Sequence, residues 1–318
     1  MNRRIIFMGT PPFAVASLNA LIAAKMEVAA VVTAPDRPAG RGRQPRMSAV
    51  KERALELGLP ILQPENLKAP EFHAELDRFD ASLYIVVAFR MLPASVWGRP
   101  ARGTVNLHGS LLPDYRGAAP INWAVINGEQ RTGVSTFFIN DRIDTGDLLL
   151  REVMEIGPDE NAGSVHDRLM MTGADLLLRT AKDILDGTVE GIPQEEFVGD
   201  AVHAAPKLTP ENCRINWALS AKHVHDHIRG LSPFPGAWTL WKEEDQPDRQ
   251  VKFLIARPMP TSSKRPTSGT VQMHDERLII SCGEGSIEVL ELRMEGKRTM
   301  NAPSFLRGLQ RRNGITVC

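Results

Sequence analysis

Two polar side chains stand two residues apart in the short segment Thr104–His108, which reads TVNLH. Alternating apolar and polar residues predict a strand, with Asn106 and His108 on one face and the apolar side chains on the other. A glycine and a proline-containing loop follow at once, so the pair is expected at the carboxyl end of its strand. In an open α/β sheet, ligands bind at this edge.

A second apolar run, residues 134–139, leads into a turn-rich loop with three carboxylates, those of Asp141, Asp144 and Asp147. An amide, an imidazole and a carboxylate, without a nucleophile of their own, can stabilise an oxyanion and move a proton while an amine attacks a carbonyl. Asn106 and His108 could equally just satisfy hydrogen bonds at a strand end. The spacing alone leaves both interpretations open.

The elements that would position these groups alternate along the first part of the chain. Apolar patterns predict strands at residues 5–8, 28–33, 61–62 and 83–87, and helices at 13–24, 48–57 and 70–79. This order is typical of a doubly wound, mostly parallel, Rossmann-like sheet. Gly9 follows the first strand, but no G-x-G-x-x-G motif accompanies it, which favours a tight turn over a dinucleotide site.

The remaining chain changes character. A long helix is expected at residues 164–185, with Ser164 as its N-cap, and another at 218–228. Short strand patterns then recur at 237–241, 251–256, 269–273, 278–282 and 287–292, before a last short helix at 303–309. They predict a small antiparallel barrel, of the oligonucleotide-binding type or another kind. The expected domains are residues 1–204 and 212–318, joined by a linker at 205–211 that is rich in proline and charge.

Composition excludes several classes of protein. The chain has 318 residues, with 38 Lys plus Arg against 38 Asp plus Glu, so any nucleic-acid contact must come from a local basic patch. Three scattered cysteines argue against a disulfide framework or a zinc cluster and fit a cytoplasmic protein. The apolar stretches are too short for a signal peptide or a membrane span. The protein is expected to be a monomer.

A basic segment at residues 35–46 interrupts the strand–helix pattern, with four arginines against one acidic residue, Asp36. Such a loop could be a solvated connection, or an arm that binds phosphates through arginine forks.

A second conspicuous segment holds His223, His225 and His227 within a helical pattern. His223 and His227 would share an outer helix face, for which a solvated surface is favoured over a metal site.

A longer run of sequence connects these features. NLHGSLLPDYRGAAPINWAVINGE, followed by TGVSTFFINDRIDTGD, is similar to the folate-dependent formyltransferase family, over about forty residues. MGTPPFAV at residues 8–15 and TAPDRPAGRGR at 33–43 narrow the similarity to members that act on initiator tRNA. The chain departs from many relatives at residues 88–93, AFRMLP, where they have a tyrosine and a glycine.

The resemblance implies transfer of a formyl group from 10-formyltetrahydrofolate to the amine of methionine on initiator methionyl-tRNA, without a metal. It implies Asn106, His108 and Asp144 as catalytic residues, with Asp144 favouring the imidazolium form of His108 or positioning a water. Folate-binding residues are expected to be Phe89, Met91, Leu92, Ser110, Leu111, Leu112 and Pro113. The basic arm would contact tRNA through Arg37, Arg41, Arg43 and Arg46. Lys207, in the expected linker, is a further expected tRNA-binding residue, but it could as easily be a linker lysine.

Two other functions fit parts of the pattern. A relative that formylates an amino sugar or a purine precursor would share the catalytic residues but have no use for an arginine-rich arm. A non-catalytic RNA-binding or sensor protein on the same fold would lack the complete set of Asn106, His108 and Asp144, which this chain has.

Overall fold

The computed structural model describes residues 2–39, 44–197, 202–260, 267–309 and 314–318. The chain divides into two compact units. The first contains Met1–Gly117, Gly133–Met154 and Asp167–Ala204, and the second contains Ala118–Thr132, Glu155–His166 and Ala205–Cys318. Arg41 and Arg43, two of the expected tRNA-binding residues, lie outside the described residues.

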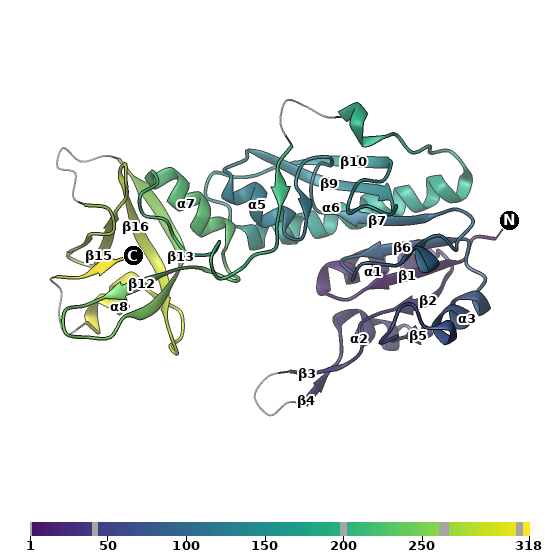
Figure 1. Ribbon diagram of the computed structural model, residues 1–318, viewed down its shortest axis with the longest axis horizontal. Helices are drawn as coiled ribbons and strands as arrows, with labels where there is room; N and C mark the ends of the chain where they lie inside the picture. The colour runs from purple at the N-terminus through teal and green to yellow at the C-terminus, as the bar shows by residue number, and fades with distance from the viewer. Residues whose placement is uncertain (1, 40–43, 198–201, 261–266, 310–313) are drawn as a thin grey trace. The chain divides into compact units, whose positions relative to one another are not determined.

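A seven-stranded sheet forms the centre of the first unit, in the order β10-β9-β7-β6-β1-β2-β5 (Figure 1). The pairs from β5 through β7 are all parallel, and the order reverses beside β1. This confirms the predicted doubly wound, mostly parallel sheet. The strands are β1 (Ile5–Gly9), β2 (Val28–Val32), β5 (Ile61–Leu62), β6 (Leu83–Val87), β7 (Thr104–His108), β9 (Arg131–Phe138) and β10 (Leu148–Glu155).

Helices cover both faces of this sheet because its central strands are apolar on both sides. One face, which includes Ile6 and Met8, packs against residues of α3 and α4. On the other face α1 contacts β1 and β6, and α2 contacts β2 and β5. Buried parallel strands need apolar residues at successive positions, and β1 and β6 are buried throughout. The helices are α1 (Pro12–Ala23), α2 (Ala49–Glu56), α3 (Pro70–Arg78) and α4 (Ala94–Trp97).

The turn after β1 explains why Gly9 is a glycine. A Cβ at this position would lie 2.6 Å from the Cβ of Ala14 and 3.1 Å from the carbonyl oxygen of Val87. The missing side chain lets α1 approach β1 closely, which fits the structural role predicted for this glycine.

The edge of the sheet beyond β7 runs the other way. β9 is antiparallel to β7, with Phe138 opposite Val105 and Ser135 opposite His108. Ile139 therefore lies beside the amino end of β7, and the following loop must return toward His108. The strand patterns alone did not predict this reversal.

The long helix α6 (Ala162–Asp186) covers the Leu107 side of β7. A Cβ on Gly173 of this helix would be 3.0 Å from the Leu107 side chain, and Thr180 Oγ1 is 2.8 Å from Thr136 Oγ1, opposite Leu107 in the register. Because side chains alternate along a strand, Asn106 and His108 project from the other face, as predicted.

Side chains cap the starts of two helices, one of them predicted to begin at Ser164. Ser48 caps α2, since its side chain accepts a hydrogen bond from the Lys51 amide. The N-cap predicted at Ser164 is wrong: α6 already begins at Ala162, and the Asn161 side chain accepts the Ser164 amide at 2.9 Å. Asparagine is as good a cap as serine, so local sequence did not separate them.

The second unit is built on an antiparallel sheet in the order β14-β15-β16-β13-β12-β18, with β17 paired to β16. A bridge between Thr270, just before β14, and Thr316 of β18 links the first and last strands, so the sheet is nearly closed. The predicted small antiparallel barrel is confirmed. Its strands are β12 (Ala237–Lys242), β13 (Arg249–Met259), β14 (Val271–His274), β15 (Arg277–Ser281), β16 (Ser286–Met294), β17 (Met300–Asn301) and β18 (Thr316–Val317).

Aromatic side chains fill the core of this barrel. Trp217 meets Phe253 edge to face at 6.0 Å between ring centroids, and Trp241 meets Phe305 in the same manner at 5.2 Å. The α7 side chains Val224 and Ile228 belong to the same core. The unit's helices are α5 (Pro120–Ile126), α7 (Ala221–Gly230) and α8 (Ala302–Arg307).

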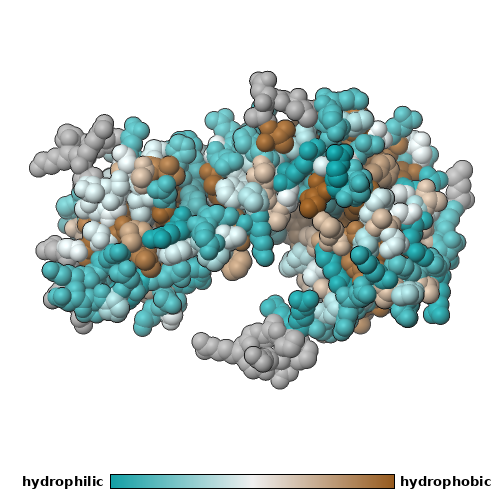
Figure 2. Space-filling view, in the orientation of Figure 1, coloured by the Kyte–Doolittle hydropathy of each residue, from teal (hydrophilic) through white to brown (hydrophobic). Residues whose placement is uncertain are grey.

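The surface is mostly hydrophilic on the face shown in Figure 2, where hydrophobic residues gather in small groups. Among the described residues, the helices are all too short or too polar to cross a lipid bilayer.

The three cysteines are free thiols: Cys213 and Cys282 are buried, and Cys318 is exposed. Burial raises the pKa of the Cys282 thiol to about 12, so this cysteine stays protonated.

Candidate active site

His108 closes β7 with its imidazole buried, at 7% exposure. Its Nε2 lies 2.9 Å from the Tyr115 carbonyl oxygen. A carbonyl can only accept a hydrogen bond, so Nε2 carries a proton and donates it. Nδ1 is then the ring nitrogen that can take up or release a proton during a reaction.

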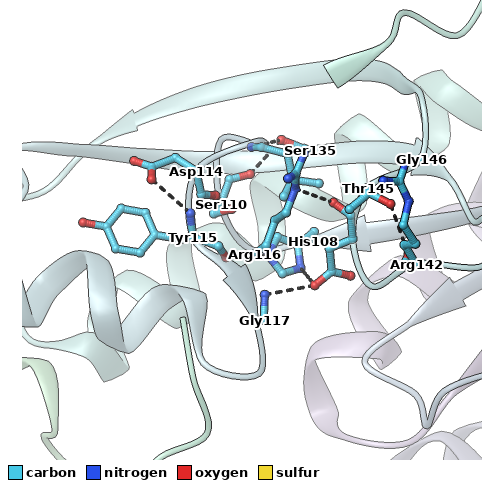
Figure 3. A network of polar contacts seen from close by, with 12 residues as sticks. His108, Ser110, Asp114, Tyr115, Arg116, Gly117, Ser135, Arg142, Thr145 and Gly146 are labelled. Atoms are coloured by element: carbon cyan, nitrogen blue, oxygen red, sulfur yellow. Dashed lines mark hydrogen bonds and ion pairs between the residues drawn. The ribbon is translucent and has the colours of Figure 1, made fainter. Parts of the chain in front are cut away.

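The Asp144 carboxylate faces this second nitrogen, with Oδ2 3.8 Å from His108 Nδ1. The same oxygen accepts a hydrogen bond from the Gly117 amide at 3.0 Å. In Figure 3 the dashed lines from the labelled His108 and Gly117 end on one carboxylate oxygen. The carboxylate is only 15% exposed. Its backbone has a φ of 53°, in the left-handed region that costs energy for residues other than glycine. The structure therefore brings together two of the three predicted catalytic residues.

The separation of these two groups limits what they can do directly. A distance of 3.8 Å is longer than a hydrogen bond between nitrogen and oxygen. An atom that lies beside the pair, from a substrate or a water, could reach both groups and exchange a proton with either. Because both side chains are largely shielded from solvent, the negative charge of Asp144 acts on the imidazole with little screening.

Asn106 precedes His108 by two residues and is partly exposed. In the described part of the chain, its side-chain amide has no hydrogen-bond partner. Its neighbours in the sheet are Val86 and Phe137, which offer no polar side-chain atom. The amide is therefore free to donate to a ligand on the same face as the His108 imidazole.

The predicted folate-binding loop after β7 is held by its own polar groups. Ser110 is fully buried and donates to the Asp114 carbonyl at 2.6 Å, while Ser135 Oγ donates to the Ser110 carbonyl and accepts the Leu112 amide. Leu112 is buried in a cluster with Phe137 and Leu148. The side chains of Ser110 and Leu112 are thus occupied within the protein, and Pro113 is buried too. Leu111 is partly exposed.

The second predicted folate-binding segment follows β6, which neighbours β7 in the sheet. Leu92 is buried and Phe89 packs against the same core cluster, whereas Met91 is 71% exposed. In the Asp144 loop, Ile143 is 60% exposed. The large apolar side chains of Met91 and Ile143 are thus exposed, and they could pack against an apolar part of a ligand.

Arg90 marks the departure from the family pattern noted above. Its guanidinium donates to the backbone carbonyls of Pro64 and Glu65, and it lies 5.6 Å from the Phe89 ring centroid. Burial, together with the nearby charge of Arg37, lowers the pKa of Arg90. The arginine therefore braces the segment that carries Phe89 and Met91.

The sequence pattern did not indicate two further residues at this site. Arg116 Nε donates to the Asp144 carbonyl at 3.0 Å, and the buried Gln194 donates from Nε2 to the same carbonyl at 3.0 Å. Gln194 lies 50 residues beyond Asp144 in the sequence. No local motif indicated it, and its full burial as a polar residue becomes visible only in the fold.

The base of the basic arm is a short hairpin of β3 (Arg37–Ala39) and β4 (Gln44–Arg46), in which Arg37 pairs with Arg46. Both arginines are exposed. Asp36, the acidic residue of the segment, is hydrogen-bonded to Lys51 at 2.5 Å, which lowers the pKa of its carboxyl. Asp36 is thus neutralised by a lysine outside the arm.

Lys207, the other predicted tRNA-binding residue, lies in the second unit, and its side chain is exposed.

The histidines of α7 face different surroundings. His223 Nδ1 lies 2.7 Å from the hydroxyl of the capping residue Ser220, and His225 is buried with Nε2 3.5 Å from Asp159. Burial lowers the pKa of His227, whose Nε2 is buried. His223 is exposed as predicted, whereas His227 is only partly exposed, so the predicted solvated face holds only in part for His227.

Comparison with protein families agrees with this geometry. Residues 3–181 match the formyl transferase family, and residues 207–310 match the C-terminal domain of formyl transferases. The chain belongs to the formyl transferase family, and it is an enzyme that transfers formyl groups.

Individual relatives narrow the class. The chain is 45% identical over 317 residues to the methionyl-tRNA formyltransferase of Parabacteroides distasonis, which covers 99% of this chain and 98% of that protein. It is 46% identical over 306 residues to the methionyl-tRNA formyltransferase of Flavobacterium johnsoniae, with 96% of each chain covered. The similarity extends over both units.

Solved structures of more distant proteins share the fold. An N-formyltransferase from Helicobacter canadensis, in complex with folinic acid and dTDP-3-aminofucose, aligns with a TM-score of 0.65 and 17% identity over 91% of this chain and 99% of that one. HypX from Aquifex aeolicus, in complex with tetrahydrofolic acid, gives a TM-score of 0.63 at 18% identity over 96% of this chain. The chain spans 47% of the length of HypX.

Proposed function

We propose that this chain transfers the formyl group of 10-formyltetrahydrofolate to the free amino group of methionine on initiator methionyl-tRNA, for translation initiation. The observation that carries the proposal is the buried His108–Asp144 pair, within a chain that is 45% identical over nearly its full length to a methionyl-tRNA formyltransferase. Such a site has an acid–base pair and an amide donor, which suits direct transfer between two bound substrates.

In this proposal the methionine amine attacks the formyl carbon, a new C–N bond forms, and the bond from that carbon to the folate nitrogen breaks. The negative charge that develops on the formyl oxygen needs preorganised donors. The Asn106 amide, free of described partners, and the protonated Nδ1 of His108 would supply them. The Tyr115 carbonyl supports this role because it orients the ring through Nε2.

One proton must also move from the attacking amine to the departing folate nitrogen. Asp144 is proposed to assist in one of two ways: its charge favours the imidazolium form of His108, or it positions a water that relays the proton. The separation of 3.8 Å between Oδ2 and Nδ1 is longer than a direct hydrogen bond, which leaves both groups able to contact a third atom beside them.

Folate is proposed to bind along the segments after β6 and β7. Phe89, Met91 and Leu111 would offer apolar contacts. Leu92, Ser110, Leu112 and Pro113 would contribute mainly backbone atoms, because their side chains are buried. The exposure of Met91 supports this assignment.

Recognition of tRNA is proposed for the arginines of the arm and for Lys207. The exposed pair Arg37 and Arg46, with Asp36 neutralised by Lys51, supports a locally positive surface. We assign catalysis to residues 1–204 and tRNA contact to residues 212–318, joined by 205–211; the two family matches support this division. The enzyme is proposed to act as a cytoplasmic monomer.

The test is a formylation assay with 10-formyltetrahydrofolate and charged initiator tRNA. Formylmethionyl-tRNA is the expected product, formed without added metal. Matched reactions would offer an amino sugar nucleotide and a purine-precursor amine in place of tRNA. Formylation of one of these, with no reaction on tRNA, would refute the proposal and favour a small-molecule formyltransferase.

A further inference from the structure

A fully buried amide holds the main chain of the Asp144 loop. Gln194 begins the short 3-10 helix η1 (Gln194–Phe197) and is 0% exposed. Its Nε2 donates to the carbonyls of Asp144, at 3.0 Å, and Gly146, at 2.8 Å. Its Oε1 accepts from Arg116, at 2.6 Å from Nη2 and 3.0 Å from Nε. Both amide protons and the amide oxygen are therefore used.

Arg116 also holds the Asp144 loop. Its Nε also reaches the Asp144 carbonyl at 3.0 Å, and the amide of the next residue, Gly117, donates to the Asp144 carboxylate. The backbone and the side chain of Asp144 are thus held by adjacent residues. Gly146 adds a close approach, since a Cβ there would lie 1.6 Å from the Phe138 carbonyl oxygen.

This support matters because Asp144 has a positive φ. Aspartate enters the left-handed region more readily than most residues other than glycine, and contacts that fix its main chain select that conformation over the others. The direction of the Asp144 side chain follows from that backbone conformation. Rotation of φ to a negative value would carry the carboxylate away from His108 Nδ1.

We propose that Gln194 and Arg116 form a positioning pair, which holds the Asp144 main chain in its left-handed conformation and so directs the carboxylate at His108. Neither residue needs to touch a substrate for this role. The inference deepens the proposed function and rests on the role given there to Asp144. A purely structural brace would affect stability but leave the His108–Asp144 geometry unchanged.

The first measurement is single-turnover formylation by Gln194→Ala, with saturating folate and tRNA. A loss of roughly a hundredfold is expected from a displaced reacting group, with KM for both substrates little changed. Thr180→Val is the matched control, because it also removes buried hydrogen bonds from the first unit, to Thr136 and to the Leu176 carbonyl. It should unfold at a lower temperature and keep its turnover.

The second measurement combines Gln194→Ala with Asp144→Asn. If Gln194 acts through Asp144, the double variant should be no slower than Asp144→Asn alone, within about twofold. Losses that multiply would overturn the proposal, because they would mean that Gln194 acts independently. Wild-type turnover by folded Gln194→Ala would overturn it too. If Gln194→Ala does not fold, Gln194→Met keeps the side-chain length without the hydrogen bonds.

A third readout does not depend on formyl transfer. In protein labelled with ¹⁵N-histidine, the ring signals of His108 can be assigned by their loss in His108→Ala. Gln194→Ala should shift these signals in the same direction as Asp144→Asn, and Thr180→Val should not. Unchanged ring signals would overturn the positioning role. Failure of the wild type to formylate tRNA would refute the proposed function and leave this spectrum interpretable.

Discussion

Replacing Asp144 with asparagine isolates the charge of this residue from its shape. Asparagine is tolerated in the left-handed region as well as aspartate is, and its side-chain oxygen can still accept the Gly117 amide. The change removes a negative charge 3.8 Å from His108 Nδ1. At an effective dielectric constant of about 20, two unit charges at that separation interact with about 4 kcal/mol. If the imidazolium forms in the transition state, this corresponds to about three orders of magnitude in rate.

We therefore expect Asp144→Asn to lose between about two and about four orders of magnitude in turnover, as for other acid–base groups. The assay is single-turnover formylation of charged initiator tRNA, repeated across a pH series. Asp141→Asn is the matched control, because Asp141 is an exposed carboxylate in the same loop. Unchanged turnover with an unchanged pH–rate profile for Asp144→Asn would refute the reasoning. An equal loss in Asp141→Asn or Asp147→Asn would move the acid–base role elsewhere in the loop.

Three further outcomes are expected. Asn106→Ala and His108→Ala should each lose roughly a hundredfold or more in single-turnover rate while still binding folate. Near-normal rates would refute the proposal that these two side chains stabilise the oxyanion. Arg41→Ala combined with Arg43→Ala should flatten the slope of log tRNA affinity against log salt by up to about 1.5, with folate binding unchanged, and superimposable curves would exclude the arm. Burial lowers the pKa of His227, so below about pH 6.5 the unfolded state binds more protons than the folded state, and the free energy of unfolding should fall as the pH falls. Urea unfolding of His227→Gln should therefore depend less on pH than unfolding of the wild type, and an equal pH dependence would contradict this reasoning.

The strands that position the site were predictable because their patterns are local. β5, β6 and β7 begin and end at the predicted residues. The doubly wound order follows from the alternation of strands and helices, which leaves few topologies. The alternation of side chains in β7 likewise placed Asn106 and His108 together on one face.

The remainder of the site depends on contacts between distant segments. The direction of β9 is set by its pairing with β7, which no residue within the strand specifies. Gln194 was missed for the same reason, because its partners lie 48 to 78 residues away in the sequence. The partial burial of His227 depends on the packing around α7, so a helical pattern alone could not reveal it.

The contacts that hold Asp144 have a consequence for how this enzyme could diversify. Gln194 and Arg116 donate hydrogen bonds to main-chain carbonyls of the loop. The side chains at the tip of the loop are exposed, those of Asp141, Arg142 and Ile143. Backbone contacts do not depend on which side chains the tip carries. Substitutions there could change the surface offered to an incoming substrate without moving the Asp144 carboxylate. A library varied at the tip is therefore a route to new acceptor specificities with the His108–Asp144 pair retained.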